Sequence, residues 1–195
     1  MTSSPLTTFR FADEACIAQA MPRPSPRVTP TSPATSVMTD LTEVSAATVS
    51  PDLTLDQAEQ AMIRHGVRML FVVTHMPCVD GIVTLAMLRG DKPVRLAGQR
   101  QVRRSELCVA DVMSKLGELD VLDWATLARA TVADVAAVLQ RFGMPHLLVA
   151  EPASALGPAR IRGVISHTQV ERQLGATLPA VIVPRTFAEI ELALA

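Results

Sequence analysis

The chain has 195 residues, of which 49% are apolar, enough for one compact domain or two small half-domains with a real core. Its 18 basic and 19 acidic residues nearly cancel, which excludes a global field that would attract nucleic acid or an anionic membrane. No run approaches the roughly 18 to 20 uninterrupted apolar residues of a membrane span, so we expect a soluble protein.

The three cysteines, Cys16, Cys78 and Cys108, are widely spaced and form no CxxC pair. This pattern fits a reducing compartment better than a disulfide framework. Asp13 and Glu14 stand where a signal peptide would need its apolar stretch, so the sequence predicts a cytoplasmic protein.

Residues 1–36 are predicted to be an N-terminal arm and linker. Their second half, "MPRPSPRVTPTSPATS" (Met21–Ser36), is rich in Pro, Ser and Thr and has no apolar period, which is typical of an extended linker. We expect the arm to contribute little to stability unless it lies across a neighbour.

The remainder contains an internal repeat. "TLDQAEQAMIRHGVRMLFVV" (54–73) aligns without a gap on "TVADVAAVLQRFGMPHLLVA" (131–150), and a Val-Met pair precedes each copy, at Val37 and Val112. Each copy is predicted to run strand, helix, strand, strand, helix. We place the first copy at 37–100, the second at 101–175 and a C-terminal extension at 176–195.

Capping residues and an apolar period define the repeat helices. Thr54 and Thr131 are good N-cap residues, and Gly66 and Gly143 supply left-handed C-caps. Apolar residues recur every three and four positions after Thr131 and predict one buried face: Val132, Val135, Leu139 and Phe142.

The strands that follow these helices, "RMLFVV" and "HLLVA", are continuous apolar runs. Such runs are typical of strands buried on both faces. Neither copy can bury its sheet alone, so we expect the two copies to pack together. The basic stretch "RLAGQRQVRR" (Arg95–Arg104) between them is predicted to be a solvated linker.

The repeat resembles the CBS-domain family, in which two copies form the pseudo-twofold Bateman module. The motifs that carry the resemblance are "VSPDLTLDQAEQAMIRHGVRMLFVV" with "GIVTLAML", and "ATVADVAAVLQRFGMPHLLVA" with "RGVISHTQV". The resemblance covers roughly residues 37–175. It implies an α/β fold, a pseudo-twofold pair of CBS repeats, each a small three-stranded sheet with flanking helices.

In this family the cleft between the repeats often binds adenosine ligands such as AMP, ATP or S-adenosylmethionine. The site motif is Gly-apolar-apolar-Thr/Ser-x-x-Asp, with the hydroxyl near phosphate or ribose and the aspartate on the ribose diol. The resemblance places Thr84 and Ser166 at the hydroxyl positions, and Met87 and Gln169 stand at the aspartate positions. It implies a possible adenosyl ligand and no required cofactor.

A carboxylate that accepts both ribose hydroxyls makes charge-assisted bonds worth about 1.5 to 3 kcal/mol each. Gln169 keeps a neutral acceptor, whereas Met87 offers only flexible apolar surface. The half-site of Ser166 and Gln169 is therefore favoured, with Thr131 near the adenine edge and His146 inward on its strand. The candidate ligand-binding residues are Thr84, Met87, Arg68, Met69, Val49, Ser166, Gln169, Thr131 and His146.

Four of the candidates have a purely structural alternative. Thr84 and Ser166 can cap the helices that follow them, Arg68 can form a surface ion pair instead of meeting a phosphate, and His146 is favoured as a hydrogen-bonded core histidine over a ligand or pH-sensing group. Trp124 is interpreted as a core or cleft-rim residue.

The sequence argues against metal binding and catalysis. "HMPC" (His75–Cys78) holds three metal donors but no second paired cluster, and no Cys, His and acid fall at the spacing of a nucleophile with its base. We therefore expect a non-enzymatic, stand-alone regulatory module that senses an adenine nucleotide or a related molecule. The alternative is a dimerisation or assembly module whose nucleotide site has been lost. Either would form a homodimer through the CBS helices and could dock on a regulated partner.

Overall fold

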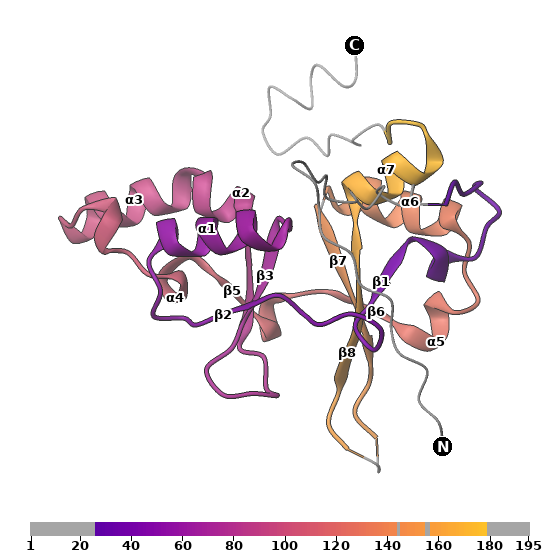
Figure 1. Cartoon of the computed structure of the whole chain (residues 1–195), viewed down its shortest axis with the longest axis horizontal. Helices are drawn as coiled ribbons and strands as arrows, with labels where there is room; N and C mark the ends of the chain where they lie inside the picture. The colour runs from indigo at the N-terminus through magenta and orange to yellow at the C-terminus, as the bar shows by residue number, and fades with distance from the viewer. Residues whose placement is uncertain (1–25, 144, 155–156, 179–195) are drawn as a thin grey trace, which may run out of the picture.

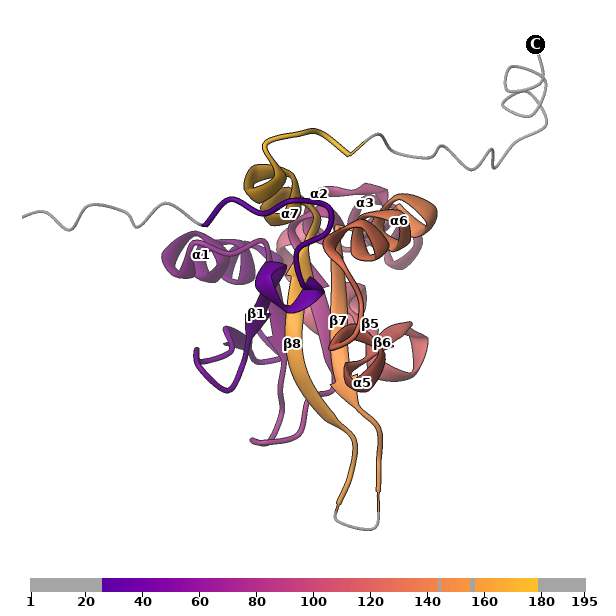
Figure 2. The same ribbon diagram turned by 90° about the vertical axis from the view of Figure 1, so that its right-hand side faces the viewer.

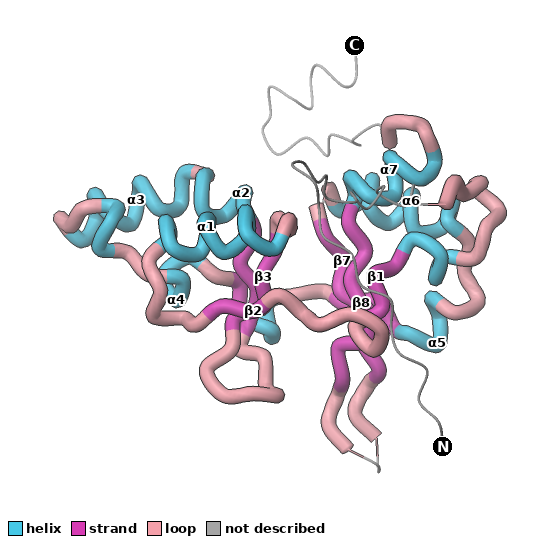
Figure 3. The backbone as a smooth tube through the Cα atoms, viewed as in Figure 1, coloured by secondary structure: helices cyan, strands magenta, loops and turns pink. Residues whose placement is uncertain are grey.

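The computed structural model describes residues 26–143, 145–154 and 157–178 (Figure 1). Within them lie two four-stranded sheets, each accompanied by helices (Figure 3). In two perpendicular views the longer helices lie at one end of the molecule, while the β3–β4 loop and the β7–β8 hairpin extend at the other (Figures 1 and 2). The prediction of an α/β fold is confirmed.

The first sheet has the strand order β2-β3-β4-β5. Strands β2 and β3 are parallel, and the β3–β4 and β4–β5 pairs are antiparallel. All residues of β3 and β4 are buried, as the apolar runs predict. The strands span Thr48–Val49 (β2), Met69–Val72 (β3), Gly81–Thr84 (β4) and Ser114–Lys115 (β5).

The second sheet has the order β1-β8-β7-β6. Here β6 and β7 are parallel, and β7–β8 and β1–β8 are antiparallel. The pairing of His146 with Ser166 in this sheet matches that of Met69 with Thr84 in the first. The strands span Met38–Asp40 (β1), Val121–Asp123 (β6), His146–Glu151 (β7) and Arg160–Ser166 (β8).

The helices follow the predicted caps. The Thr54 hydroxyl accepts from the Gln57 N–H at 3.2 Å, and Gly66 ends the helix at φ 64°; Thr131 and Gly143 repeat the arrangement. The helices span Leu55–His65 (α1), Leu85–Arg89 (α2), Asp91–Arg100 (α3), Val109–Val112 (α4), Trp124–Leu127 (α5), Val132–Phe142 (α6) and His167–Leu174 (α7), with 3-10 turns at Ala34–Val37 (η1), Arg104–Glu106 (η2) and Leu116–Glu118 (η3).

The strand count departs from the predicted three per repeat because the two halves exchange strands. β1, near the start of the first copy, pairs with β8 of the second, and β5, near the start of the second copy, pairs with β4 of the first. The sheets therefore cross the proposed boundary at residue 100, and the division of the chain into repeats at that residue stays a prediction.

Two glycines make room for the exchanged strands. A Cβ at Gly81 would collide with the backbone carbonyl oxygen of Ser114 in β5, and one at Gly163 would collide with the Met38 side chain in β1. The Thr39 carbonyl oxygen would also lie 2.8 Å from a Cβ at Gly163. Gly81, the first residue of β4, and Gly163, in the middle of β8, therefore allow the close approach of a strand from the other half.

The core has three parts. One lies in each half, and a third joins the sheets, so the predicted packing of the two copies is confirmed. This joining cluster brings residues of β3 and β4 against β7: Met69, Phe71, Ile82 and Leu148. Along α6, the predicted apolar face is buried at Val132, Val135 and Leu139.

The predicted linker before Val37 is part of the second half over its described residues. Val28 N–H donates to the Gln173 carbonyl, and Ala34 N–H donates to that of Ala130, both at 3.0 Å. Ala34 and Val37 are fully buried. The prediction of an extended linker is wrong for residues 28–36, because backbone hydrogen bonds and burial hold this proline-rich segment against the second half. Its contribution to stability stays a prediction. Residues 1–25 of the arm and 179–195 of the C-terminal extension lie outside the described residues.

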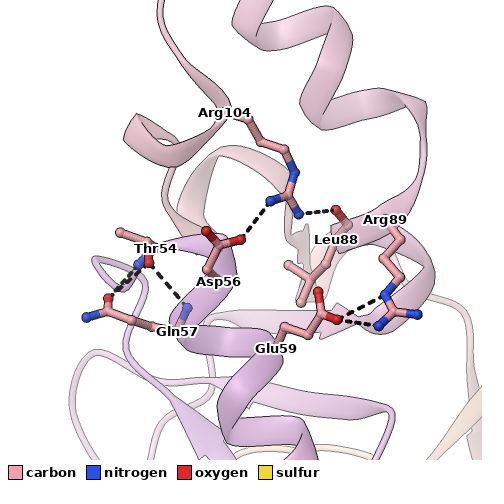
Figure 4. A network of polar contacts seen from close by, with 7 residues as sticks. All are labelled: Thr54, Asp56, Gln57, Glu59, Leu88, Arg89 and Arg104. Carbon is pink, nitrogen blue, oxygen red and sulfur yellow. Dashed lines mark hydrogen bonds and ion pairs between the residues drawn. The ribbon is translucent and has the colours of Figure 1, made fainter.

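The basic stretch Arg95–Arg104 is not a solvated linker. Residues up to Arg100 belong to α3, and the Arg104 guanidinium donates to Asp56 of α1 at 2.7 Å and to the Leu88 carbonyl of α2 at 3.1 Å (Figure 4). Arg89 pairs with Glu59 across the same two helices. These arginines join the helices over the first sheet, which a local charge pattern does not reveal.

In the described part of the chain no helix is both long and apolar enough to cross a bilayer.

We expect Gly81→Ala to lower the free energy of unfolding by about 2 kcal/mol, because the new methyl group must displace the backbone of β5. Gly98→Ala is the matched control. A Cβ at Gly98, inside α3, meets nothing within 4 Å, so this change should stabilise the protein by about 0.5 to 1 kcal/mol. Urea denaturation measures both, and equal effects of the two substitutions would contradict the strand-exchange account.

Candidate ligand-binding site

A cavity of about 440 Å³ lies where the two halves meet. Three parts of the chain line it: the segment after β1, the connection from α1 into β3, and the ends of β7 and β8 with the first turns of α7. Its lining consists of Thr39, Leu41, Val44, Ser45, Ala46, Ala47, His65, Gly66, Val67, Arg68, Met69, Phe71, His146, Val164, Ser166, Thr168, Gln169 and Arg172.

The cavity brings together candidates from both repeats. Arg68 and Met69 come from the first half, and His146, Ser166 and Gln169 come from the second. The left-handed Gly66 ends α1 and turns the chain into β3, which puts Arg68 and Met69 at the cavity. Three residues of the half-site that the sequence favours, Ser166, Gln169 and His146, line this cavity, and Thr131 does not.

Ser166 and Thr84 occupy matching positions but differ in their bonding. The Thr84 hydroxyl accepts from the Met87 N–H at 3.3 Å and caps α2, and its residue is 4% exposed. Ser166 precedes α7, but its side chain makes no capping hydrogen bond, and it lines the cavity. The capping alternative therefore holds for Thr84 and not for Ser166.

Met87 and Gln169 also diverge. Met87 packs against the core of the first half and does not line the cavity, whereas Gln169 does. A carboxylate at position 87 would be partly buried among apolar side chains, where desolvation disfavours the charged form. The residue at the aspartate position of the first half-site therefore packs against the core of its own half, whereas its counterpart in the second half faces the cavity.

Two further candidates lie away from the cavity lining. Val49 is a buried core residue of the first half. The Thr131 hydroxyl donates to Asp134 Oδ2 at 2.7 Å within the capping box of α6. Contact of either residue with a ligand stays a prediction.

His146 departs from the hydrogen-bonded core histidine that the sequence favours. Its Nδ1 is buried without a hydrogen-bond partner among the described residues, and the ring lines the cavity. Burial, and secondarily the positive charge of Arg68, lower the pKa of His146 to about 4. The imidazole is therefore neutral at physiological pH and offers the cavity a nitrogen that can donate or accept.

Arg68 differs from the expected surface ion-pair arginine. Its side chain is exposed, and within the described ranges no carboxylate pairs with it. Arg172, the other arginine of the lining, was missed at the level of sequence. The signal was present, because residues 168, 169 and 172 share one face of a helix at spacings of three and four. Thr39 of β1 and Ala47 of the following loop carry no such signal.

The remaining motifs lie elsewhere. Trp124 packs against the core of the second half, with the Arg162 guanidinium 4.8 Å from its ring centroid, a cation–π distance. In "HMPC", Cys78 is exposed, and the described part of the chain contains no group of three His, Cys, Asp or Glu side chains placed to hold a metal ion.

No known family model matches this sequence, and no curated protein is similar to it at a significant level. Solved structures are similar in fold. The crystal structure of CBSX2 with AMP, a CBS-pair protein of Arabidopsis thaliana, has a TM-score of 0.50 at 19% identity, over 72% of this chain and 94% of that one.

Two other structures give the same result. An uncharacterised conserved protein from Pyrococcus horikoshii has a TM-score of 0.51 at 16% identity, over 73% of this chain and 92% of that one. The CBS domain pair of protein MJ0100, with 5'-methylthioadenosine and S-adenosyl-L-methionine, has a TM-score of 0.50 at 14% identity, over 75% and 98%. The chain has the fold of a tandem CBS-domain pair, a Bateman module.

The lowered pKa of His146 predicts acid sensitivity. Above pH 6.5 both the folded and unfolded states hold a neutral imidazole; as pH falls from about 6.5 toward 4, only the unfolded state takes up the proton, so stability falls. From pH 7 to pH 5 this loss should reach about 2 kcal/mol. Urea denaturation of wild type, His146→Gln and the control His75→Gln should show the loss reduced in His146→Gln alone. An unchanged pH dependence in that variant would argue against a buried neutral His146.

Proposed function

We propose that this protein is a non-catalytic regulatory module that binds an adenine nucleotide or a related adenosyl molecule in the cavity between its two CBS repeats. The observation that carries the proposal is the convergence of Arg68, Met69, His146, Ser166 and Gln169 on one cavity. The pattern of the sequence selects these residues, and the fold joins them from both halves.

The size and composition of the cavity support a small organic ligand. Its volume of about 440 Å³ lies within the range of about 300 to 1,000 Å³ of such sites. Met69, Phe71 and Val164 give it apolar walls for a planar base, and Ser166 and Gln169 supply polar groups. The AMP of the CBSX2 structure and the adenosyl ligands of the MJ0100 structure suggest the same class for this chain.

The position of the cavity supports a regulatory role. Because both halves line it, a ligand favours the arrangement of the halves to which it binds more tightly. Such a preference can be transmitted to a partner without any chemical step.

The second candidate is an assembly module, which the buried, helix-capping Thr84 and the core packing of Met87 favour. Exposed apolar side chains also support association: Ile63 on α1 is 63% exposed and Val94 on α3 is 67% exposed. A homodimer through the CBS helices is compatible with both candidates. Ligand binding distinguishes them.

Substitutions at the matching hydroxyls test the proposed site. Ser166→Ala should weaken AMP binding by about threefold to tenfold, the loss of one hydrogen bond, with little change in melting temperature. Thr84→Ala should leave AMP affinity unchanged and lower stability by about 1 kcal/mol, the loss of a helix cap. Calorimetric titration and thermal melting measure the two effects. Absence of AMP, ATP and S-adenosylmethionine binding by wild type would reject the sensor and favour the assembly module.

We expect a homodimer in solution, held by apolar side chains of the helices over the first sheet. Light scattering coupled to gel filtration should give twice the monomer mass for wild type and the monomer mass for the double variant Ile63→Glu, Val94→Glu. Val121→Glu, at a 48% exposed position of β6, is the control and should remain dimeric. A monomeric wild type at micromolar concentration would refute this expectation.

A further inference from the structure

The charge of the cavity lining has one sign. Arg68 and Arg172 both line the cavity, and none of its lining residues is an aspartate or a glutamate. His146 adds no charge at neutral pH because burial keeps its pKa low. The fixed charge at the cavity is therefore positive.

Neither guanidinium has a hydrogen bond or an ion pair within the described ranges. Other arginines of the chain are paired with carboxylates: Arg89 with Glu59, Arg100 with Asp111, Arg103 with Glu106, Arg104 with Asp56, and Arg162 with Asp40 and Glu151. These five arginines are partly neutralised by their carboxylates, whereas Arg68 and Arg172 keep their guanidinium groups available at the cavity.

Acidic residues next to the lining do not neutralise it. The Asp40 carboxylate accepts from Thr42 at 2.6 Å and pairs with Arg162 at 3.3 Å. Glu171 accepts from the Leu178 N–H at 2.9 Å and faces His167. Glu43 is exposed on the loop after β1 and does not line the cavity.

The two arginines come from different halves of the molecule. Arg68 directly precedes β3 of the first sheet, and Arg172 lies in α7, which follows β8 of the second. The first turn of α7 also faces the cavity through Thr168 and Gln169, and the positive end of a helix dipole favours an anion. An anionic group in the cavity is thus attracted by both halves at once.

We propose, on the basis of the adenosyl site described above, that the cavity selects an adenosyl ligand bearing a phosphate, held jointly by Arg68 and Arg172, over neutral and cationic adenosyl molecules. A phosphate accepts charge-assisted hydrogen bonds from guanidinium groups. Adenosine lacks that group, and the sulfonium of S-adenosylmethionine brings a positive charge to a lining that has no carboxylate to receive it.

Calorimetric titration of the full chain with AMP, adenosine and S-adenosylmethionine tests this selection. AMP should bind at least about tenfold more tightly than adenosine, and S-adenosylmethionine should bind more weakly than adenosine. The advantage of AMP over adenosine should shrink as salt rises, because salt screens exposed charges. This measurement on wild type does not depend on any variant being folded.

Substitution of each arginine tests whether Arg68 and Arg172 cause the preference for AMP over adenosine. Arg68→Gln and Arg172→Gln should each reduce AMP affinity by at least about fivefold and leave adenosine affinity unchanged. Arg160→Gln removes the same charge from the exposed start of β8, outside the cavity lining, and should leave AMP affinity unchanged. An equal loss in Arg160→Gln would show a general charge effect and overturn the assignment.

The remaining outcomes separate this inference from the proposed function. If AMP, adenosine and S-adenosylmethionine bind equally well, charge selection is wrong and the adenosyl site stands. Titration with pyrophosphate, an anion without an adenosyl group, tests the anion site separately. If it binds in an arginine-dependent manner while no adenosyl molecule binds, the anion site stands and the adenosyl function fails. If neither pyrophosphate nor any adenosyl molecule binds, both are overturned.

Discussion

The close approach of exchanged strands at Gly81 and Gly163 is the constraint on which the rest of the structure depends. Each glycine lets a short strand from the other half lie beside β4 or β8. Because β1 is thereby fixed to the second sheet and β2 to the first, the segment between them must run from one half to the other. That segment supplies Leu41, Val44 and Ala47 to the cavity, so the exchange also builds one wall of the site.

The two repeats share a backbone plan but differ at the residues that face ligand or core. Met69 pairs with Thr84 as His146 pairs with Ser166, yet only Ser166 of the two hydroxyls reaches the cavity. In the first repeat the hydroxyl caps α2 and Met87 packs into the core. In the second, Gln169 and Arg172 keep their polar groups at the cavity. Pseudo-symmetry of the fold therefore coexists with an asymmetric site.

The sequence predicted the parts of this structure that local patterns determine. The helix ends are marked by short-range hydrogen bonds and left-handed backbone at Thr54, Thr131, Gly66 and Gly143. The ungapped repeat predicted that both halves would have the same succession of strands and helices along the chain. Ser166, Gln169, His146, Arg68 and Met69 were selected by the resemblance and do converge on one cavity. The exchange of strands was missed because β5 spans only two residues and β1 only three, too short for a periodic signal. Arg104 was assigned to a linker because its partners, Asp56 and Leu88, are distant in sequence, and the same distance hides which of Thr84 and Ser166 faces the cavity.

The exchange of β1 and β5 also determines which fragments of the protein can form complete sheets. A fragment that ended before β5 would leave the Gly81 edge of β4 without its neighbour, and a fragment that began after β1 would leave the β8 edge open in the same way. Exposed strand edges invite pairing with other chains, so single repeats cut at the sequence boundary would tend to aggregate. The two repeats therefore form one folding unit. A half can complete its sheet only together with the short strand that the other half contributes, β5 for the first sheet and β1 for the second.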